Sequence, residues 1–357
     1  MTIGVEEEFL LVDPSTRRPV ARAADVLARV RDLPPGAKAH RELSGVQVEF
    51  ASGVCADLDE LREHLVAGRR ALTEAARAEG LWLVASGTPP LADPSPALSA
   101  GERFEQIEVM YRRQVTGYQC CGCHVHVGVP DVETAVHVVD HLRPWLPTLL
   151  ALGANSPFDD DGDTGYASWR MMDQARFPNS GVPPLFGSAA AYDARLARLV
   201  DCGVLVDHTQ TFWLARPSPK YPTVEVRVAD AAATVDHAVL QAGLTRALVD
   251  TARVAGPAPE LDDQVLAAAV WTAARYGLSG PGVDPFTARR VPAVELLEAL
   301  LEHVSDALGE DREPVRALVD DVLEHGTGAQ RQLRAGSPDE AVDLLACDPA
   351  GAGSPRA

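Results

Sequence analysis

The sequence has little of what nucleic-acid or membrane binding requires. Its 51 Asp and Glu residues outnumber 32 Lys and Arg, giving a formal net charge of -19 at pH 7 over 357 residues. A generic electrostatic grip on nucleic acid or anionic lipid needs the opposite surplus. Apolar stretches fall short of the roughly 20 residues that span a bilayer, and Met1–Glu6 lacks the basic and apolar regions of a secretion signal. We expect a cytoplasmic protein that binds neither nucleic acid nor membrane.

Cysteine is scarce as well, with six in the chain, too few for a disulfide framework in a cytoplasmic protein of this length. Three of them lie in Cys120-Cys121-Gly122-Cys123-His124, which has the C-x-x-C-H spacing of c-type haem attachment and, with His126, could imitate a zinc site. Haem attachment of that type takes place outside the cytoplasm, and the sequence has no second C-x-x-C. We therefore expect free thiols, whose effect on any site nearby stays open.

Several familiar functional motifs are missing. The sequence contains no G-x-x-x-x-G-K-[ST], no G-x-G-x-x-G between a strand and a helix, and no H-E-x-x-H, which argues against a P-loop, a Rossmann site and a zinc hydrolase. The acidic run Asp159-Asp160-Asp161-Gly162-Asp163 lacks the spaced ligands and terminal Glu of a calcium loop, so we predict a solvated turn. An ATP-binding protein with this sequence must hold its nucleotide in another way.

What the sequence does have is a set of segments that alternate between an apolar and an ionisable face, as strands of one sheet do. They are Ile3–Leu11, Val46–Ala51, Cys123–Val129 and Val224–Ala229. Helical patterns lie between and after them, at Asp57–Gly80, Val132–Leu152 with a bend at Pro144 and Pro147, Ala233–Val254, Leu261–Tyr276, Ala293–Leu308 and Glu313–His325. Strands early and helices late predict an α+β fold. We expect one domain over 1–346 and a disordered tail over 347–357, rich in Gly, Ala, Pro and Ser.

The non-apolar faces of the four predicted strands carry residues of one chemical kind. A solvated strand face is ordinarily a mixture of Thr, Lys, Ser and Gln, and isolated charges there mean nothing. Here the faces present Glu6, Glu8, Glu49, His124, His126, Glu225 and Arg227. Four strands that agree on metal-ligand residue types favour a functional site over four unrelated solvated faces.

The chemistry of this set indicates magnesium and phosphate. Glu6 and Glu8 lie two positions apart, so their strand separates them by about 7 Å and can serve two ions. Carboxylates with imidazoles and no committed thiolate suit Mg²⁺ or Mn²⁺, and Mg²⁺ is usually shared with the phosphates of a nucleotide. Arg227, on the same face as Glu225, has the charge to hold a phosphoryl group during its transfer.

These residues also resemble a known family. Gly4-Val5-Glu6-Glu7-Glu8-Phe9, Val48-Glu49-Phe50, Gly122-Cys123-His124-Val125-His126-Val127-Gly128 and Val224-Glu225-Val226-Arg227 are similar, in order and spacing, to the glutamate-cysteine ligase type 2 family of carboxylate-amine ligases. The stretch from Asn155-Ser156-Pro157 to Ser168-Trp169-Arg170 resembles that family too. The resemblance implies a glutamine synthetase-like fold related to the guanido kinase catalytic domain: a curved antiparallel sheet backed by helices, with two or three Mg²⁺ ions and ATP inside.

The resemblance also implies a reaction and roles for single residues. Glutamate would attack the γ-phosphate of ATP to give a γ-glutamyl phosphate, and the amine of cysteine would displace phosphate to give γ-glutamylcysteine. Residues that match the family's metal ligands are Glu6, Glu8, Glu49, His124 and Glu225. Arg227 matches the residue that contacts the transferred phosphoryl group. His126 is a candidate contact to nucleotide or substrate, and Arg170 a candidate clamp for a substrate carboxylate or else a surface arginine.

Several alternatives stay open. The chain could be a ligase for another acid and amine, a guanidino kinase-like phosphotransferase, or a nucleotide-binding relative without activity. A site without function has no physical reason to keep four like charges crowded on one face, which argues against the last. Apolar helices in the C-terminal half could support a homodimer.

Overall fold

The computed structural model describes residues 1–92 and 97–348. Its largest sheet has seven strands, all paired antiparallel in the order β10-β11-β5-β1-β3-β2, with β4 beside the far end of β1. The strands are β1 (Ile3–Val12), β2 (Lys38–Arg41), β3 (Gln47–Ala51), β4 (Trp82–Val84), β5 (Gly122–Gly128), β10 (Ala215–Pro217) and β11 (Thr223–Asp230). Three two-stranded sheets lie outside it, formed by β6 (Phe158–Asp159) with β7 (Gly162–Asp163), β8 (Ser180–Gly181) with β9 (Phe212–Trp213), and β12 (Pro281–Asp284) with β13 (Arg289–Pro292).

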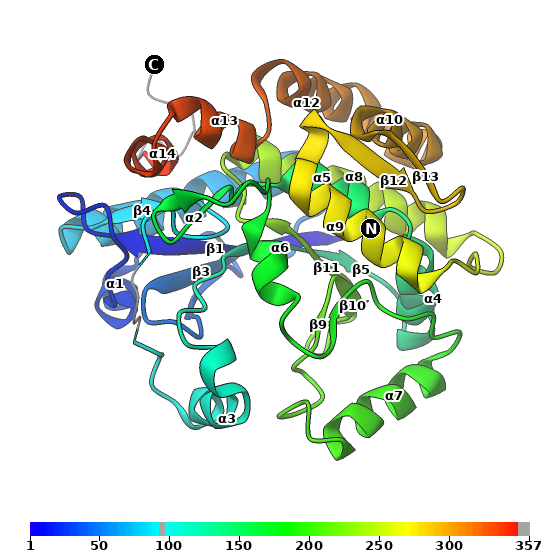
Figure 1. Ribbon diagram of the computed structural model, residues 1–357, viewed down its shortest axis with the longest axis horizontal. Helices are drawn as coiled ribbons and strands as arrows, with labels where there is room; N and C mark the ends of the chain where they lie inside the picture. Colours follow the sequence, from blue (N-terminus) through cyan, green and yellow to red (C-terminus); the bar gives the residue numbers. More distant parts are fainter. Residues whose placement is uncertain (93–96, 349–357) are drawn as a thin grey trace.

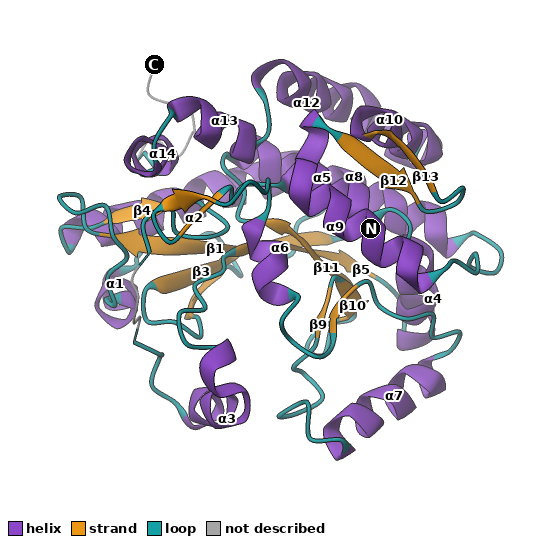
Figure 2. Ribbon diagram, viewed as in Figure 1, coloured by secondary structure: helices purple, strands orange, loops and turns teal. Residues whose placement is uncertain are grey.

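Helices back one face of the large sheet and leave the other open (Figure 1). The helices are α1 (Ala23–Arg29), α2 (Leu58–Ala78), α3 (Glu102–Tyr111), α4 (Val132–Leu142), α5 (Leu146–Gly153), α6 (Trp169–Gln174), α7 (Ala189–Asp201), α8 (Val235–Arg253), α9 (Asp263–Tyr276), α10 (Ala293–His303), α11 (Ser305–Leu308), α12 (Arg312–His325), α13 (Gly328–Ala335) and α14 (Pro338–Leu345). Short 3₁₀ turns follow at Arg112–Gln114, Gly277–Ser279 and Gly309–Asp311. Figure 2 shows α3 and α7 on the side of the sheet opposite to α8 and α12, flanking the open face.

The apolar face of the sheet and the covering helices form one core. Ile3, Val5 and Phe9 of β1 are buried in the same cluster as Leu61 and Leu65 of α2. Because strand side chains alternate between faces, burying these positions turns Glu6 and Glu8 to the open side. The core that stabilises the sheet therefore also directs these two carboxylates to the open face.

The four predicted strands and the predicted α+β class are confirmed. The helix predicted over Val132–Leu152 breaks into α4 and α5 at Arg143–Trp145, next to Pro144, as the loss of a backbone donor requires. The acidic run at 159–163 is the tight turn of the β6–β7 hairpin, and Asp161 forms an ion pair with Arg18. Of the predicted tail, residues 349–357 lie outside the described residues.

Glu7, which interrupts the alternation of the first strand, has a structural partner. Its carboxylate lies on the helix-covered face and accepts hydrogen bonds from Arg69 of α2, at 3.1 Å to Nε and 2.5 Å to Nη2. Both side chains are almost fully buried, and Arg69 also donates to the carbonyl of Ala232 at 2.7 Å. The pair thus joins β1, α2 and the segment after β11.

In residues 1–92 and 97–348, none of the helices has the length and hydrophobicity of a transmembrane span.

The Glu7–Arg69 pair provides a test of this core. Glu7→Gln leaves a buried guanidinium without its counter-charge, so we expect it to lower the free energy of unfolding by about 3–5 kcal/mol. Glu298→Gln is the matched control, because Glu298 pairs with Arg316 at 2.8 Å with both side chains more than 40% exposed, and such pairs contribute less than about 1 kcal/mol. Urea unfolding measures both. Equal losses in the two variants would contradict the structural role of Glu7.

Candidate functional site

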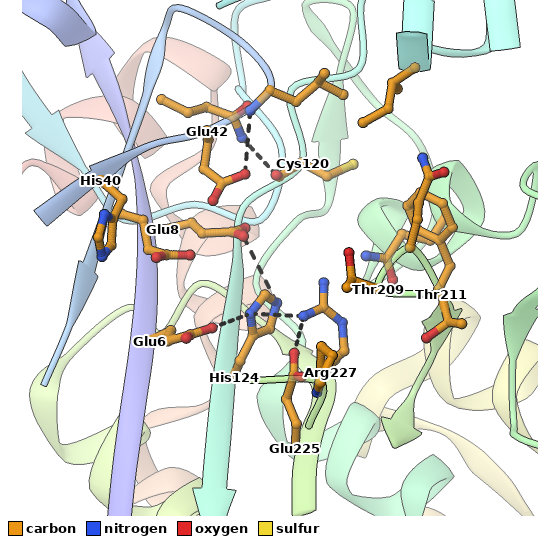
Figure 3. Close-up of a pocket in the computed structure, with 18 of the residues that line it drawn as sticks. Glu6, Glu8, His40, Glu42, Cys120, His124, Thr209, Thr211, Glu225 and Arg227 are labelled. Carbon is orange, nitrogen blue, oxygen red and sulfur yellow. Dashed lines mark hydrogen bonds and ion pairs between the residues drawn. The ribbon is translucent and has the colours of Figure 1, made fainter. Parts of the chain in front are cut away.

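The open face of the sheet forms the floor of a cavity of about 560 Å³. Every site residue predicted from the sequence lines it: Glu6, Glu8, Glu49, His124, His126, Arg170, Glu225 and Arg227. Figure 3 shows the carboxylates of Glu6 and Glu8 on one side of His124 and the guanidinium of Arg227 on the other. Four strands that lie far apart in sequence thus contribute to one cavity.

Strand register explains how these residues meet. Glu6 lies opposite His124, Glu8 lies opposite Glu49, and His126 lies opposite Glu225. Directly opposed side chains of an antiparallel pair have Cβ atoms about 4.5–5.5 Å apart, close enough to share a ligand. The floor of the site is therefore set by backbone pairing and needs no loop to assemble it.

Glu6, His126 and Glu225 form a first group whose ligand atoms lie within 4.8 Å of one another. Nδ1 of His126 lies 2.9 Å from Oγ1 of Thr223, and Nε2 faces Oε1 of Glu6 at 3.5 Å. That Nε2 is buried and makes no hydrogen bond within the described residues. Burial would raise the pKa of Glu6, but the neighbouring imidazoles of His124 and His126 outweigh it and hold the pKa well below the ordinary value.

Glu8, Glu42 and Glu49 form a second group, again with ligand atoms within 4.8 Å. Burial raises the pKa of Glu49 well above its ordinary value, and the neighbouring charges of Glu42 and Glu6 add to the shift. Burial likewise raises the pKa of Glu8 and of Glu42. Over residues 1–92 and 97–348, no Lys or Arg forms an ion pair with Glu42 or Glu49. Within the described residues, Glu42 and Glu49 are thus crowded against Glu8 without an arginine or lysine in ion-pair contact with either of them.

His124 lies between the two groups. Its Nδ1 is 3.4 Å from Oε2 of Glu6, and its Nε2 is 3.9 Å from Oε1 of Glu8. Burial and the charge of Arg227 lower the pKa of this imidazole, which favours the neutral form that a metal ligand requires. Its assignment as a metal ligand stays a prediction.

Arg227 enters the cavity beside Glu225, with which it forms an ion pair. Arg216 of β10 grips the same carboxylate through two bonds, Nε to Oε2 at 2.8 Å and Nη2 to Oε1 at 3.1 Å. Burial would raise the pKa of Glu225, but Arg216 and Arg227 together lower it below its ordinary range. Glu225 is thus fixed in its ionised form, with one arginine braced behind it and the other directed into the cavity.

The role of Arg170 as a clamp for a substrate carboxylate stays a prediction. Arg170 is not a surface arginine, since its side chain is 1% exposed, although it lines the cavity. Its Nη2 donates to the carbonyl of Arg227 at 3.2 Å, and its Nη1 lies 3.7 Å from Oδ1 of Asp230. The guanidinium is therefore engaged with backbone and with a buried carboxylate.

Sequence reasoning missed three residues of this site: His40, Glu42 and Arg216. The register places His40 of β2 opposite Glu49, and Glu42 follows directly after the same strand. Lys38–Arg41 is exposed over most of its length and has no apolar face, so its sequence carries no strand signal. Arg216 lies in a strand of three residues, too short for alternation to be recognised. The spacing of His40 and Glu42, two positions apart, was the only available sign.

The neighbouring cysteines do not form a metal site. Cys120 belongs to a cluster with Tyr118 and Phe177, Cys121 to a second with Leu10, and Cys123 to the main core. Burial raises the pKa of all three thiols, so none is a ready thiolate. Among the described residues, no cysteine joins a group of potential metal ligands.

The donors present fit a hard divalent cation. The second group offers carboxylate oxygens alone, and the first combines two carboxylates with a buried, unbonded imidazole nitrogen. Oxygen-rich sets of this kind suit Mg²⁺ or Mn²⁺ rather than a structural zinc ion. A divalent cation would also offset the repulsion among Glu8, Glu42 and Glu49.

The amino-acid sequence of the protein matches a known family over almost its whole length. The sequence profile of glutamate-cysteine ligase family 2 matches residues 2–346. The chain belongs to this family of carboxylate-amine ligases. A protein of Saccharopolyspora erythraea with the provisional name glutamate-cysteine ligase 2-2 is 53% identical, covering 97% of this chain and 92% of its own. A relative in Salinispora arenicola, provisionally named glutamate-cysteine ligase 2, is 44% identical over 98% and 92% of the two chains.

Solved structures confirm the glutamine synthetase-like fold. A glutamate-cysteine ligase from Francisella tularensis, in complex with AMP, superposes with a TM-score of 0.74 at 12% identity, covering 96% of this chain and 87% of its own. The Pup ligase PafA in complex with Pup reaches a TM-score of 0.52 at 14% identity, over 97% and 72% of the two chains. At such identities the likeness concerns the fold alone.

The crowding of three carboxylates predicts that removing one of them raises the stability of the protein but weakens its binding of metal. Glu49→Gln removes one of three like charges, so we expect the variant to be more stable than the wild type in EDTA. The pKa of Glu49 is raised in the folded state, so the charge of Glu49 destabilises the folded protein as the pH rises above about 4.5. The stability advantage of the variant over the wild type should therefore grow as the pH rises. We expect Mn²⁺ affinity to fall at least about tenfold.

Thermal unfolding with EDTA or Mn²⁺, and calorimetric titration of Mn²⁺, measure the two effects. Glu302→Gln serves as the control, because Glu302 lies on α10, outside both carboxylate groups. A Glu49→Gln variant that binds Mn²⁺ as the wild type does would remove Glu49 from the metal site.

Proposed function

We propose that the protein is an ATP- and Mg²⁺-dependent ligase that forms γ-glutamylcysteine from glutamate and cysteine through a γ-glutamyl phosphate. The observation that carries this proposal is the pair of ligand groups on one sheet face beside Arg227, all within one cavity. The family supplies the reaction class, the joining of a carboxylic acid to an amine. The choice of glutamate and cysteine rests on the names of the relatives.

The two ligand groups would hold the metal ions, one through Glu6, His126 and Glu225 and the other through Glu8, Glu42 and Glu49. Mg²⁺ screens the repulsion between an anionic carboxylate and an anionic triphosphate when it is bound. Since ligand sites on one strand lie about 7 Å apart at Glu6 and Glu8, a chain of phosphates can reach both. The rigid β1–β3 and β1–β5 pairings keep the donors in place without rearrangement.

Arg227 would stabilise the phosphoryl group during transfer. The γ-carboxylate of glutamate attacks the γ-phosphorus, and the bond to ADP breaks. The nitrogen of cysteine then attacks the acyl carbon, phosphate leaves, and the amine gives up a proton. Ion pairing with Glu225 holds Arg227 in its charged form. Burial would lower the pKa of Arg227, but the charge of Glu225 raises it above its ordinary value. A fixed cation aimed at developing charge lowers the barrier without reorganisation.

The reaction class can be tested by ADP release. Purified protein is supplied with ATP, Mg²⁺ and a matrix of amino acids, each acid with and without each amine. We expect turnover that requires an acid and an amine together, with glutamate plus cysteine the best pair. ADP release that needs only a guanidino compound would instead identify a phosphotransferase, and the absence of pair-dependent turnover would overturn the ligase proposal.

The role of Arg227 predicts a specific kinetic defect. Arg227→Lys keeps the charge but loses the planar fork of donors, so we expect kcat to fall roughly 100- to 1000-fold. Because the metal ligands are untouched, Mn²⁺ affinity should remain that of the wild type. Steady-state kinetics with calorimetric Mn²⁺ titration separates the two. A variant with wild-type kcat would exclude Arg227 from the reacting center.

A further inference from the structure

The stretch from Asn155 to Arg170 carries family motifs, yet most of it makes no contact with the proposed metal groups. It converges instead on Asp230, the last residue of β11, which is completely buried. Asp230 lies outside the set of residues that line the active cavity. Any effect of its carboxylate on the site must therefore be transmitted through other residues.

Asp230 is held by three hydrogen bonds from that stretch. Oδ2 accepts from the backbone nitrogen of Asn155 and from the hydroxyl of Ser156, both at 2.7 Å. Oδ1 accepts from the hydroxyl of Ser168 at 2.8 Å and lies 3.7 Å from Nη1 of Arg170. A buried carboxylate with this many donors is locked in one orientation.

Arg170 extends the contact from Asp230 to the backbone of Arg227. The pairing of β11 with β5 shifts register between Val226 and Ala229, so the intervening residues leave the regular ladder. Carbonyls in such a bulge need partners outside the ladder. Arg170 supplies one, since its Nη2 lies 3.2 Å from the carbonyl of Arg227, while the Arg227 nitrogen donates to the carbonyl of Leu214 at 2.8 Å.

Two glycines pack so closely against Asp230 and Arg170 that neither position has room for a side chain. A Cβ on Gly87 would lie 2.7 Å from Cγ of Asp230, and a Cβ on Gly122 would lie 2.4 Å from Nη2 of Arg170 and 2.7 Å from Nε2 of His124. The nitrogen of Gly122 also donates to Oε2 of Glu8 at 2.5 Å. Asp230 and Arg170 are thus packed between backbone segments that themselves support the site.

We propose that Asp230 is a positioning residue: through Arg170 it fixes the β11 bulge and so aims Arg227 at the transferred phosphoryl group. This inference rests on the proposed function, because the phosphoryl role of Arg227 belongs to it. The motif Ser156…Ser168-Trp169-Arg170 then serves to orient a catalytic residue supplied by another strand.

The test is a double-mutant cycle between Asp230→Asn and Arg227→Lys. We expect Asp230→Asn to lower kcat roughly 10- to 100-fold, because a misplaced reacting group costs that much, with KM for ATP and acid near the wild-type values. In the Arg227→Lys background the same change should cost less than about twofold, because residues that act as a unit are non-additive. Ser168→Ala, which keeps the charge of Asp230 but removes one bond to it and the cap of α6 at the nitrogen of Met171, should give a smaller loss of the same kind.

Asp140→Asn is the matched control. Asp140 is also a buried aspartate that accepts two backbone hydrogen bonds, from Phe186 at 2.9 Å and Gly187 at 2.8 Å, and it does not line the active cavity. We expect it to lower the unfolding temperature while leaving kcat unchanged. If Asp230→Asn behaves in the same way, Asp230 is only structural and the proposal fails.

Two further outcomes would overturn it. Fully multiplicative losses in the double variant would show that Asp230 acts independently of Arg227. An increase in KM for the acid with kcat unchanged would show that Arg170 binds the substrate carboxylate and that Asp230 serves this clamp instead.

A readout without ligation keeps this inference separate from the proposed function. Aluminium fluoride with ADP and Mg²⁺ mimics the transferred phosphoryl group, so it should tighten ADP binding in the wild type. Asp230→Asn and Arg227→Lys should each reduce that tightening, without adding to one another. If the wild type shows neither tighter ADP binding nor turnover, the proposed function is contradicted. If it shows either one, but the effects of Asp230→Asn and Arg227→Lys add to one another, only the positioning role is contradicted.

Discussion

Carboxylates of like charge crowd onto one face of an antiparallel sheet, and the rest of the molecule keeps them there. Glu8 and Glu49 lie directly opposite each other, and Glu42 completes their group. Unbalanced, such a group opposes folding, since burial and mutual repulsion both act against its charges. The apolar face beneath β1 and β3, packed on α2 and α8, holds the strands in a register that this repulsion cannot shift. A bound divalent cation would turn the same repulsion into binding energy.

Charge is balanced in different ways around the carboxylates in and beside the sheet. Glu7, on the helix-covered face, has a permanent partner in Arg69. Glu225 is gripped by two arginines, one of which also reaches into the cavity. Glu42 and Glu49 have no ion-pairing arginine or lysine within the described ranges. The first arrangement supports the fold, the second orients a cation beside one of the two ligand groups, and the third leaves carboxylates of the other ligand group without an ion-paired side chain.

The cavity is built from rigid and less regular parts. Its floor consists of paired strands whose register, regular except at the β11 bulge, fixes the ligand groups, whereas α3 and the segment before β9 contribute residues to its walls. Loops carry variation between relatives more readily than paired strands do. Phosphoryl chemistry would then be set by the floor, and the choice of acid and amine by the walls.

The residue types on the floor could be predicted from the sequence, because period-2 alternation records which side chains share a face. It placed Glu6, Glu8, Glu49, His124, His126, Glu225 and Arg227 on one surface, and all of them line one cavity. It could not reveal Glu42 or Arg216, which lie at or in strands too short or too exposed to leave a pattern. It indicated that Glu6 and Glu8 can serve two ions, but not which residues join each group, and it could not show that Arg170 turns away from solvent toward Asp230. Those features depend on strand order and on the β11 bulge, because these bring together residues that lie far apart along the chain.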